Sequence, residues 1–254
     1  MGNLTYLVDT DNQIKAATLG SSTADANYPL ANVKALPISK PFRFTGKTSE
    51  NITIDLLSAK TIDCVALLNS NLTTGCTITL NAGAASNPDG TTWTTTITWR
   101  QYDSFKIFTP VSYRYWKVIV ANAGNPASYI QIGYLILGDS TTLSFNYSPG
   151  WTVSDEHANL ELETEYGTTH VAELFSRVRL QLPFRGLSET DANTIRTLQR
   201  TLKRSLIPIF IAPDSAGTDA YFMRSVSNLN TQVEFYRDLD LEFLEEARGS
   251  TIIA

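Results

Sequence analysis

Short apolar or alternating runs, each bounded by Gly, Asn, Pro or Ser, fill the first half of the chain. They are Ile52–Leu56, Ile62–Leu68, Cys76–Leu80, Tyr113–Val120 and Tyr129–Asp139. β-branched and aromatic residues in runs of this length favour strands. Between residues 93 and 99, Trp93, Ile97 and Trp99 fall on one face and threonines on the other, so both tryptophans are expected in a core and not on a ligand platform. The pattern predicts an antiparallel β-sandwich.

The second half of the chain changes to strands around one helix. Val178–Phe184 alternates apolar and polar residues, Leu206–Ala212 is a short buried strand, and Asp238–Phe243 predicts a last strand with one acidic face. Ser188 begins Ser-Glu-Thr-Asp, a variant capping box in which Asp191 reaches back. The apolar residues that follow at helical spacing are Ala192, Ile195, Leu198 and Leu202. They predict one amphipathic helix over about 188–206, with its apolar stripe against the sheet.

These patterns predict a mainly β protein of two units. A polar stretch after Gly138 separates a β-sandwich over residues 1–140 from a β-rich α+β unit with one packed helix over residues 141–254. A mass of 28.0 kDa and 43% hydrophobic residues are enough for two cores. Cys64 and Cys76 fall in apolar strands and are expected to be core thiols; a disulfide between them is the alternative.

Charge limits the kind of partner. A net charge of −5 opposes broad contact with nucleic acid or an anionic membrane, and no apolar run approaches the roughly 20 residues of a membrane span. The start of the chain lacks a secretion signal, so folding in the cytoplasm is expected. The one basic stretch is Arg196, Arg200, Lys203 and Arg204 on the predicted helix. It is either a solvated face near the helix C-terminus or a contact for an acidic partner.

No motif for catalysis, metal or cofactor binding is apparent. His157 and His170 lie near several carboxylates without fixed ligand spacing, and Glu161, Glu163 and Glu165 alternate with leucines, which is typical of a strand with a solvated acidic face. The run from Asp9 has Ile14 where a calcium loop needs Gly. We therefore expect that the protein is not an enzyme and that it binds neither a cofactor nor a metal ion. The alternatives are a calcium ion bound elsewhere in the sandwich and a glycan hydrolase activity.

Several segments together resemble known families. In the first half they are Tyr28–Val33, Ile52–Leu56, Ile62–Asn69, Tyr113–Val120 and Ile132–Gly138. Their order over about residues 25–139 resembles the galactose-binding-like (discoidin-type) jelly rolls. The second half resembles a phage tail-tip domain of the distal-tail or tube-like kind, through Val178–Leu182, the capped helix, Ile207–Ile211, Tyr221–Arg224 and the last acidic strand. Distal tail proteins commonly place the ring-forming domain first, and here the order is reversed.

The resemblance implies a structural subunit of a long-tailed phage tail tip, assembled in the host cytoplasm and carried in the virion. Such a subunit would self-associate into a ring, a trimer or hexamer, and link the tail tube to hub, fibre, receptor-binding or baseplate proteins. Arg196, Arg200 and Arg204 are the expected subunit interface. The alternative is a carbohydrate-binding module without catalysis that binds a cell-surface glycan. Tyr102 and Trp151, both near turn residues, would then be the contacts.

Overall fold

The computed structural model describes residues 3–163, 165–203, 205–214, 219–227 and 237–246. The chain forms two compact units: the sandwich unit, Thr10–Thr141, and the hairpin unit, Met1–Asp9 with Thr142–Ala254. The fold class predicted from the sequence is confirmed, because both units are built mainly from strands and one helix is present in the described chain. The prediction that residues 1–140 form one unit was wrong at its start, because the first strand pairs within the hairpin unit.

The sandwich unit is built on two long strands. Its strands are β2 (Thr18–Ser21), β3 (Phe42–Arg43), β4 (Glu50–Leu68), β5 (Thr77–Gly83), β6 (Trp93–Ile97), β7 (Ser104–Ala121), β8 (Gln131–Ile132) and β9 (Tyr134–Gly138). Strand order is β2-β4-β7-β5-β6, with β9 also on β4, and β3 pairs with β8. Short helical turns at Gln13–Ala16 and Leu30–Lys34 precede β4.

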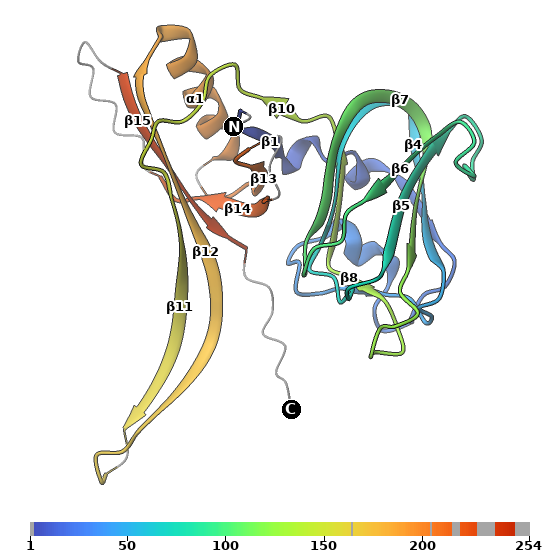
Figure 1. Cartoon of the computed structure of the whole chain (residues 1–254), viewed down its shortest axis with the longest axis horizontal. Helices are drawn as coiled ribbons and strands as arrows, with labels where there is room; N and C mark the ends of the chain where they lie inside the picture. Colours follow the sequence, from blue (N-terminus) through green and yellow to red (C-terminus); the bar gives the residue numbers. More distant parts are fainter. Residues whose placement is uncertain (1–2, 164, 204, 215–218, 228–236, 247–254) are drawn as a thin grey trace. The chain divides into compact units, whose positions relative to one another are not determined.

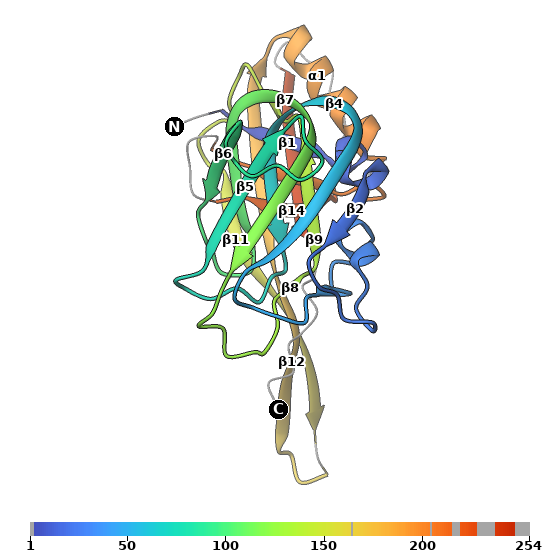
Figure 2. The ribbon, with the colours of Figure 1, turned by 90° about the vertical axis from the view of Figure 1, so that its right-hand side faces the viewer.

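Strands β4 and β7 each contribute to both layers of the sandwich. The first part of β4 pairs with β2 and the end of β7, whereas its last part pairs with β9 and the beginning of β7. The pairing register shifts between Asp55 and Lys60, where Leu57 has a positive φ of 66°. The two strands therefore arch over together (Figure 2). The two strands predicted at Ile52–Leu56 and Ile62–Leu68 are one bent strand, because the bend interrupts the alternation and not the strand.

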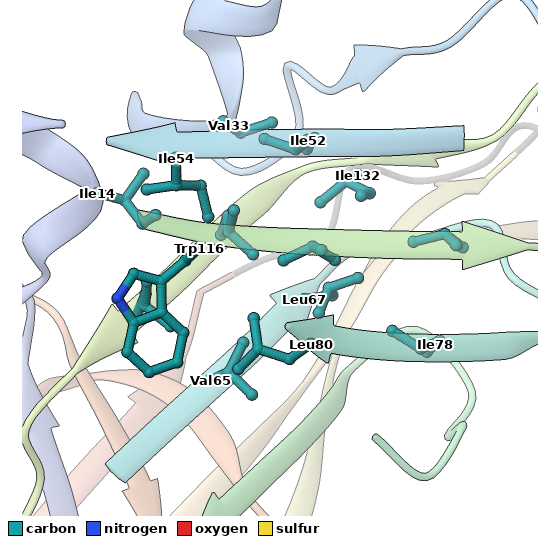
Figure 3. Close-up of a cluster of buried hydrophobic side chains, with 14 of the residues drawn as sticks. Ile14, Val33, Ile52, Ile54, Val65, Leu67, Ile78, Leu80, Trp116 and Ile132 are labelled. Carbon is teal, nitrogen blue, oxygen red and sulfur yellow. The ribbon is translucent and has the colours of Figure 1, made fainter. Parts of the chain in front are cut away.

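A continuous apolar core fills the sandwich unit (Figure 3). Trp116 is fully buried at its centre, and the ring of Trp93 lies 5.6 Å from it, centroid to centroid. Cys64 is buried and Cys76 half-buried, and both are free thiols, as predicted. Burial raises the pKa of the Cys64 thiol, so this side chain acts as a small apolar residue.

The hairpin unit contains one sheet and the helix. Its elements are β1 (Thr5–Val8), β10 (Thr141–Thr142), β11 (Thr152–Glu163), β12 (Thr169–Leu187), α1 (Glu189–Leu202), β13 (Ile209–Ala212), β14 (Tyr221–Ser225) and β15 (Arg237–Glu245). The strand order is β10-β1-β13-β14-β15-β12-β11. The predicted strands at Val178–Phe184 and Asp238–Phe243 are confirmed within β12 and β15. The strand predicted at Leu206–Ala212 begins only at Ile209, as β13, and Leu206 is exposed. Leu4, Leu180, Phe184 and Phe243 belong to the core of this unit.

Helix α1 begins and packs as predicted but ends earlier. Ser188 caps it by accepting a hydrogen bond from the Asp191 backbone N–H, and its own hydroxyl donates to Asp191 Oδ2 at 2.7 Å. The predicted apolar stripe is buried. The helix stops at Leu202 and not near residue 206, because Lys203 adopts the left-handed conformation with φ 46°.

Candidate ligand-binding and assembly surfaces

Two loops at one end of the sandwich unit enclose a hollow of about 400 Å³. One loop follows β4 and the other joins β6 to β7. The lining residues are Ser70, Asn71, Leu72, Thr73, Thr74, Trp99, Gln101 and Tyr102. The hollow therefore combines two aromatic rings with short polar side chains, which is a common composition for a small-molecule site.

Hydrogen bonds between the two loops fix the shape of the hollow. The Ser70 backbone N–H and hydroxyl both donate to the Tyr102 carbonyl, at 2.8 and 3.0 Å, and the indole N–H of Trp99 donates to the Leu72 carbonyl at 3.1 Å. Tyr102 has a positive φ of 71° and is 44% exposed. A non-glycine residue rarely adopts this conformation, and such strain is concentrated at functional sites.

Trp99 packs against the core, as the sequence predicted, and also lines the hollow, which the sequence did not predict. It is half-buried and packs against the core, as expected from the alternation of the strand. The same side chain also lines the hollow, beyond the end of β6 at Ile97. The strand pattern gives no signal for this second role, because alternation reports which face a residue is on and not what lies past the strand end.

A second cluster of aromatic and polar side chains surrounds Arg43 in the sandwich unit. The guanidinium carbon of Arg43 lies 3.6 Å from the ring centroid of Tyr28 and 4.5 Å from that of Tyr129. Its Nε donates to Gln131 Oε1 at 3.2 Å. Arg43 and Gln131 are opposite each other in the β3–β8 pair. We call these four residues the Arg43 stack.

The other aromatic residue predicted to contact carbohydrate lies elsewhere. Trp151 belongs to the hairpin unit, immediately before β11, and its ring is 5.5 Å from that of Tyr147. Tyr102 lines the hollow of the sandwich unit. The structure thus places the two predicted contacts in different units, so they do not form a single compact site within either unit.

The hairpin of β11 and β12 extends beyond the rest of its sheet (Figure 1). Its two strands pair from Thr152 with Gln181 out to Glu163 with Thr169, whereas β15 pairs with β12 only from Arg179 to Leu187. The outer part carries apolar side chains that no other strand of the described chain covers. Leu160 is 45% exposed and Leu162 59% exposed.

The two faces of this outer hairpin differ in chemistry. The pairing places Ala158, Leu160 and Leu162 of β11 with Ala172 and Phe175 of β12 on one side, the apolar hairpin face, together with His170. Glu161, Glu163 and Glu173 are exposed on the other side, the acidic hairpin face, together with Val171. The prediction of a solvated acidic strand face is confirmed. The leucines between the glutamates, however, are exposed as well.

Ion pairs across the strands fix the base of the hairpin. Arg177 Nε lies 2.6 Å from Glu156 Oε2, and Arg179 contacts both Glu156 and Glu242. The Arg177 guanidinium, followed by that of Arg179, lowers the pKa of the Glu156 carboxyl. Arg177 and Glu156 are directly opposite each other, and opposite charges at such positions favour the pairing of the two strands.

The two histidines both lie on the exposed hairpin. His157 Nδ1 is 3.0 Å from Glu173 Oε1, and this hydrogen bond raises the pKa of His157. His170 is opposite Leu162. Among the described residues, no group of three or more His, Cys, Asp or Glu side chains is arranged to hold a metal ion.

The basic residues of α1 lie along one side of the helix. Arg196 is half-buried and donates to Asn193 Oδ1 at 3.0 Å, whereas Arg200 and Lys203 are exposed. Arg204, the third residue of the predicted subunit interface, lies outside the described residues. Arg200 and Lys203 are therefore at the surface of the unit, whereas Arg196 is partly covered.

A larger hollow, of about 510 Å³, lies on the hairpin unit over β12 and β15. Its charged groups are already paired: Arg185 contacts Asp240 at 2.6 Å, and Glu242 contacts Arg179.

In the part of the chain that the structure describes, no helix is both long and apolar enough to cross a membrane.

The sequence matches no protein-family model, and it matches no curated protein. Similar solved structures include chitosan-binding module 2 of a chitosanase/glucanase from Paenibacillus sp. IK-5, in complex with chitotriose (15% identity, TM-score 0.42, 50% of this chain and 100% of that chain). The lectin domain of lectinolysin, complexed with Lewis B antigen, is similar at 12% identity and TM-score 0.42, over 52% of this chain and 99% of that chain. A GH29 fucosidase of Ruminococcus gnavus, in complex with fucose, is similar at 15% identity and TM-score 0.40, over 52% of this chain and 27% of the enzyme.

Proposed function

We propose that the sandwich unit is a non-catalytic carbohydrate-binding module and that the hollow between Trp99 and Tyr102 is its binding site. The observation that supports this proposal is the pair of aromatic side chains in a hollow fixed by hydrogen bonds. The C–H faces of a sugar ring stack on aromatic rings, and its hydroxyls need hydrogen-bond partners. Within the described chain, the Thr74 hydroxyl and the Gln101 amide make no hydrogen bond and are suited to that role.

Titration of the full chain with a panel of neutral oligosaccharides, followed by calorimetry, tests the site. Tyr102→Ala should weaken binding about tenfold, since loss of one stacking ring corresponds to about 1.4 kcal/mol. Tyr166→Ala is the matched control, because Tyr166 is 94% exposed and belongs to the other unit. Equal affinity of Tyr102→Ala and the parent chain, or no binding of any saccharide in the panel, would contradict the proposal.

As a second candidate function, we propose that the hairpin unit is an assembly module and that the chain is a tail-tip subunit of a long-tailed phage. The observation that favours it is the outer hairpin, whose apolar face is uncovered in the described chain. Exposed apolar patches of this kind are typical of protein interaction sites. The partner would be another copy of the chain in a closed ring, located in the virion tail together with tube, hub or fibre proteins.

Charge complementarity supports association between copies. The acidic hairpin face carries Glu161 and Glu163, whereas α1 carries the exposed Arg200 and the half-buried Arg196. Contact between the hairpin of one copy and the helix of the next is heterologous, and repetition of such a contact about an axis closes a ring. Opposite charges on the two surfaces also favour this register over contact between like surfaces.

Mass measurement of the intact protein tests the assembly. The parent chain should form a defined oligomer, and Arg196→Glu with Arg200→Glu should give a folded monomer. Glu161→Lys with Glu163→Lys should do the same, and mixing the two variants should restore association through the swapped charges. A parent chain that stays monomeric, or oligomers unaffected by either variant, would contradict this candidate.

A further inference from the structure

We infer that the Arg43 stack is an anion subsite and that the saccharide bound by the sandwich unit carries a carboxylate. This inference rests on the proposed carbohydrate-binding function, and it adds the chemical class of the ligand. No sequence pattern drew attention to Arg43, because its partners Tyr28, Tyr129 and Gln131 come from separate segments.

Arg43 is held in one place before any ligand binds. Its guanidinium is stacked between two tyrosine rings, at 3.6 and 4.5 Å, and tied to Gln131 at 3.2 Å. The Arg43 backbone is fixed too, since its N–H donates to the Tyr28 carbonyl and its carbonyl accepts from the Asp25 N–H. A side chain that is already ordered loses little conformational entropy on binding, which favours affinity.

The charge of Arg43 is not neutralised by a carboxylate in the described chain. Arg114, Arg177 and Arg179 each form an ion pair, whereas Arg43 forms none. The acidic residue that is bonded to its backbone, Asp25, uses its carboxylate to accept from the Asn27 N–H at 2.8 Å. Both terminal guanidinium nitrogens of Arg43 are therefore available to a ligand.

The polar groups around Arg43 are matched to an acceptor. The side-chain nitrogen of Gln131 and the hydroxyls of Tyr28 and Tyr129 make no hydrogen bond within the described chain, and all can donate. An ionised carboxylate only accepts hydrogen bonds, and it binds a guanidinium in a two-pronged geometry. A neutral sugar hydroxyl would leave most of these donors without an equally strong partner.

The stack adjoins the hollow through a single residue. Asn71 lines the hollow, its Nδ2 donates to the Tyr129 carbonyl at 3.1 Å, and its Oδ1 accepts from the Gln131 N–H at 2.8 Å. An oligosaccharide with one ring on Trp99 and Tyr102 is thereby directed past Asn71 towards Arg43. The hollow recognises the sugar ring, and the stack recognises its acidic neighbour.

Calorimetry tests the inference with two ligands. One is an oligosaccharide that contains a uronic acid, and the other is the same oligosaccharide after reduction of its carboxyl group. The parent chain should bind the acidic form about tenfold more tightly at low salt, with the preference shrinking as salt rises. Arg43→Gln should abolish the preference, so that the acidic and the neutral form bind with equal affinity. Tyr102→Ala should weaken binding of both forms. Arg43→Lys should restore part of the preference, because it keeps the charge without the planar fork.

The outcomes separate the two proposals. Binding of both forms with equal affinity, or a preference that survives Arg43→Gln, would overturn the anion subsite and leave the carbohydrate-binding function standing. Binding of neither form would overturn the carbohydrate-binding function itself. Sodium acetate and inorganic phosphate are the control ligands. If either anion displaces the acidic saccharide and binds with the same affinity as that saccharide, the stack recognises a free anion and not a sugar acid.

Discussion

Strands β4 and β12 are both 19 residues long, and they differ in what covers them. β4 bends at Leu57, and each of its two halves pairs with neighbouring strands, so the apolar positions on either side of the bend are buried, whereas Leu57 itself is exposed. In the part of the chain that the structure describes, the C-terminal half of β12 pairs with both β11 and β15, whereas its N-terminal half pairs with β11 alone. Strand length therefore does not determine burial. The bend in β4 lets both of its halves pair within the sandwich unit, whereas the outer half of β12 leaves apolar side chains such as Leu174 exposed.

The first prediction is that removal of β1 destabilises the hairpin unit and not the sandwich unit. A chain that begins at Thr10 loses the strand between β10 and β13, together with the buried side chains of Leu4 and Val8. We expect the hairpin unit to lose about 3–6 kcal/mol of stability, from two buried apolar side chains at about 1.5–3 kcal/mol each. The sandwich unit should unfold at its original temperature in calorimetry. An unchanged thermogram would show that β1 does not belong energetically to the hairpin unit.

The second prediction concerns the helix that covers the sheet of the hairpin unit. Leu198→Ala should lower the free energy of unfolding of that unit by about 2–5 kcal/mol, through lost transfer energy and the cavity left behind. Thr201→Ala on the exposed side should change it by less than about 0.5 kcal/mol. Urea unfolding measures both. Similar values for the two variants would mean that the apolar stripe does not hold the helix.

The third prediction compares two leucines on the same hairpin. Leu182→Ala at the buried base should cost about 2–5 kcal/mol, whereas Leu162→Ala on the outer part should cost under about 0.5 kcal/mol in the monomer. Dilution below the concentration at which copies associate makes this a comparison of monomers. A cost at Leu162 that persists on dilution would show that the outer hairpin is packed within the chain.

The fourth and smallest effect is electrostatic. Glu173 holds the pKa of His157 above its ordinary value of 6.5, so the pair stabilises the hairpin fully below pH 6.5 and loses that contribution as the pH rises through the folded-state pKa. Glu173→Gln should bring the pKa of His157 down towards its ordinary value in an NMR titration. Because both side chains are 55% exposed, the change in stability should be barely measurable. Identical titration curves in the two proteins would contradict the pairing.

Local patterns predicted most of the elements, and non-local pairing explains what they missed. The strands, the Ser188 cap and the buried stripe of α1 depend on neighbours within a few residues, so alternation and spacing were enough. That β1 belongs to the hairpin unit depends on its pairing with Ile209–Ala212, which no local pattern encodes. The sequence pattern also did not predict the exposure of Leu160 and Leu162, because a half-buried strand and an uncovered strand show the same alternation of apolar and polar residues.

The candidate sites were predicted only in part. Tyr102 was nominated because it lies near turn residues, and the structure places it in the hollow. Trp99 was assigned to the core alone, and the Arg43 stack was missed. The hollow that Trp99 lines and the Arg43 stack each combine residues that are distant in the sequence. Their proximity depends on how the strands that carry the loops are arranged in space, which local patterns do not predict.

The insertion of the sandwich unit after β1 has a consequence for synthesis of the protein. β1 leaves the ribosome before the sandwich unit, yet β13, with which Thr5–Val8 pairs, emerges only after the whole sandwich unit has been made. During that interval the sandwich unit can fold, because all of its strands are contiguous, whereas β1 waits as an unpaired apolar segment. We therefore expect the inserted sandwich unit to fold first and the hairpin unit, which contains β1, to be completed afterwards.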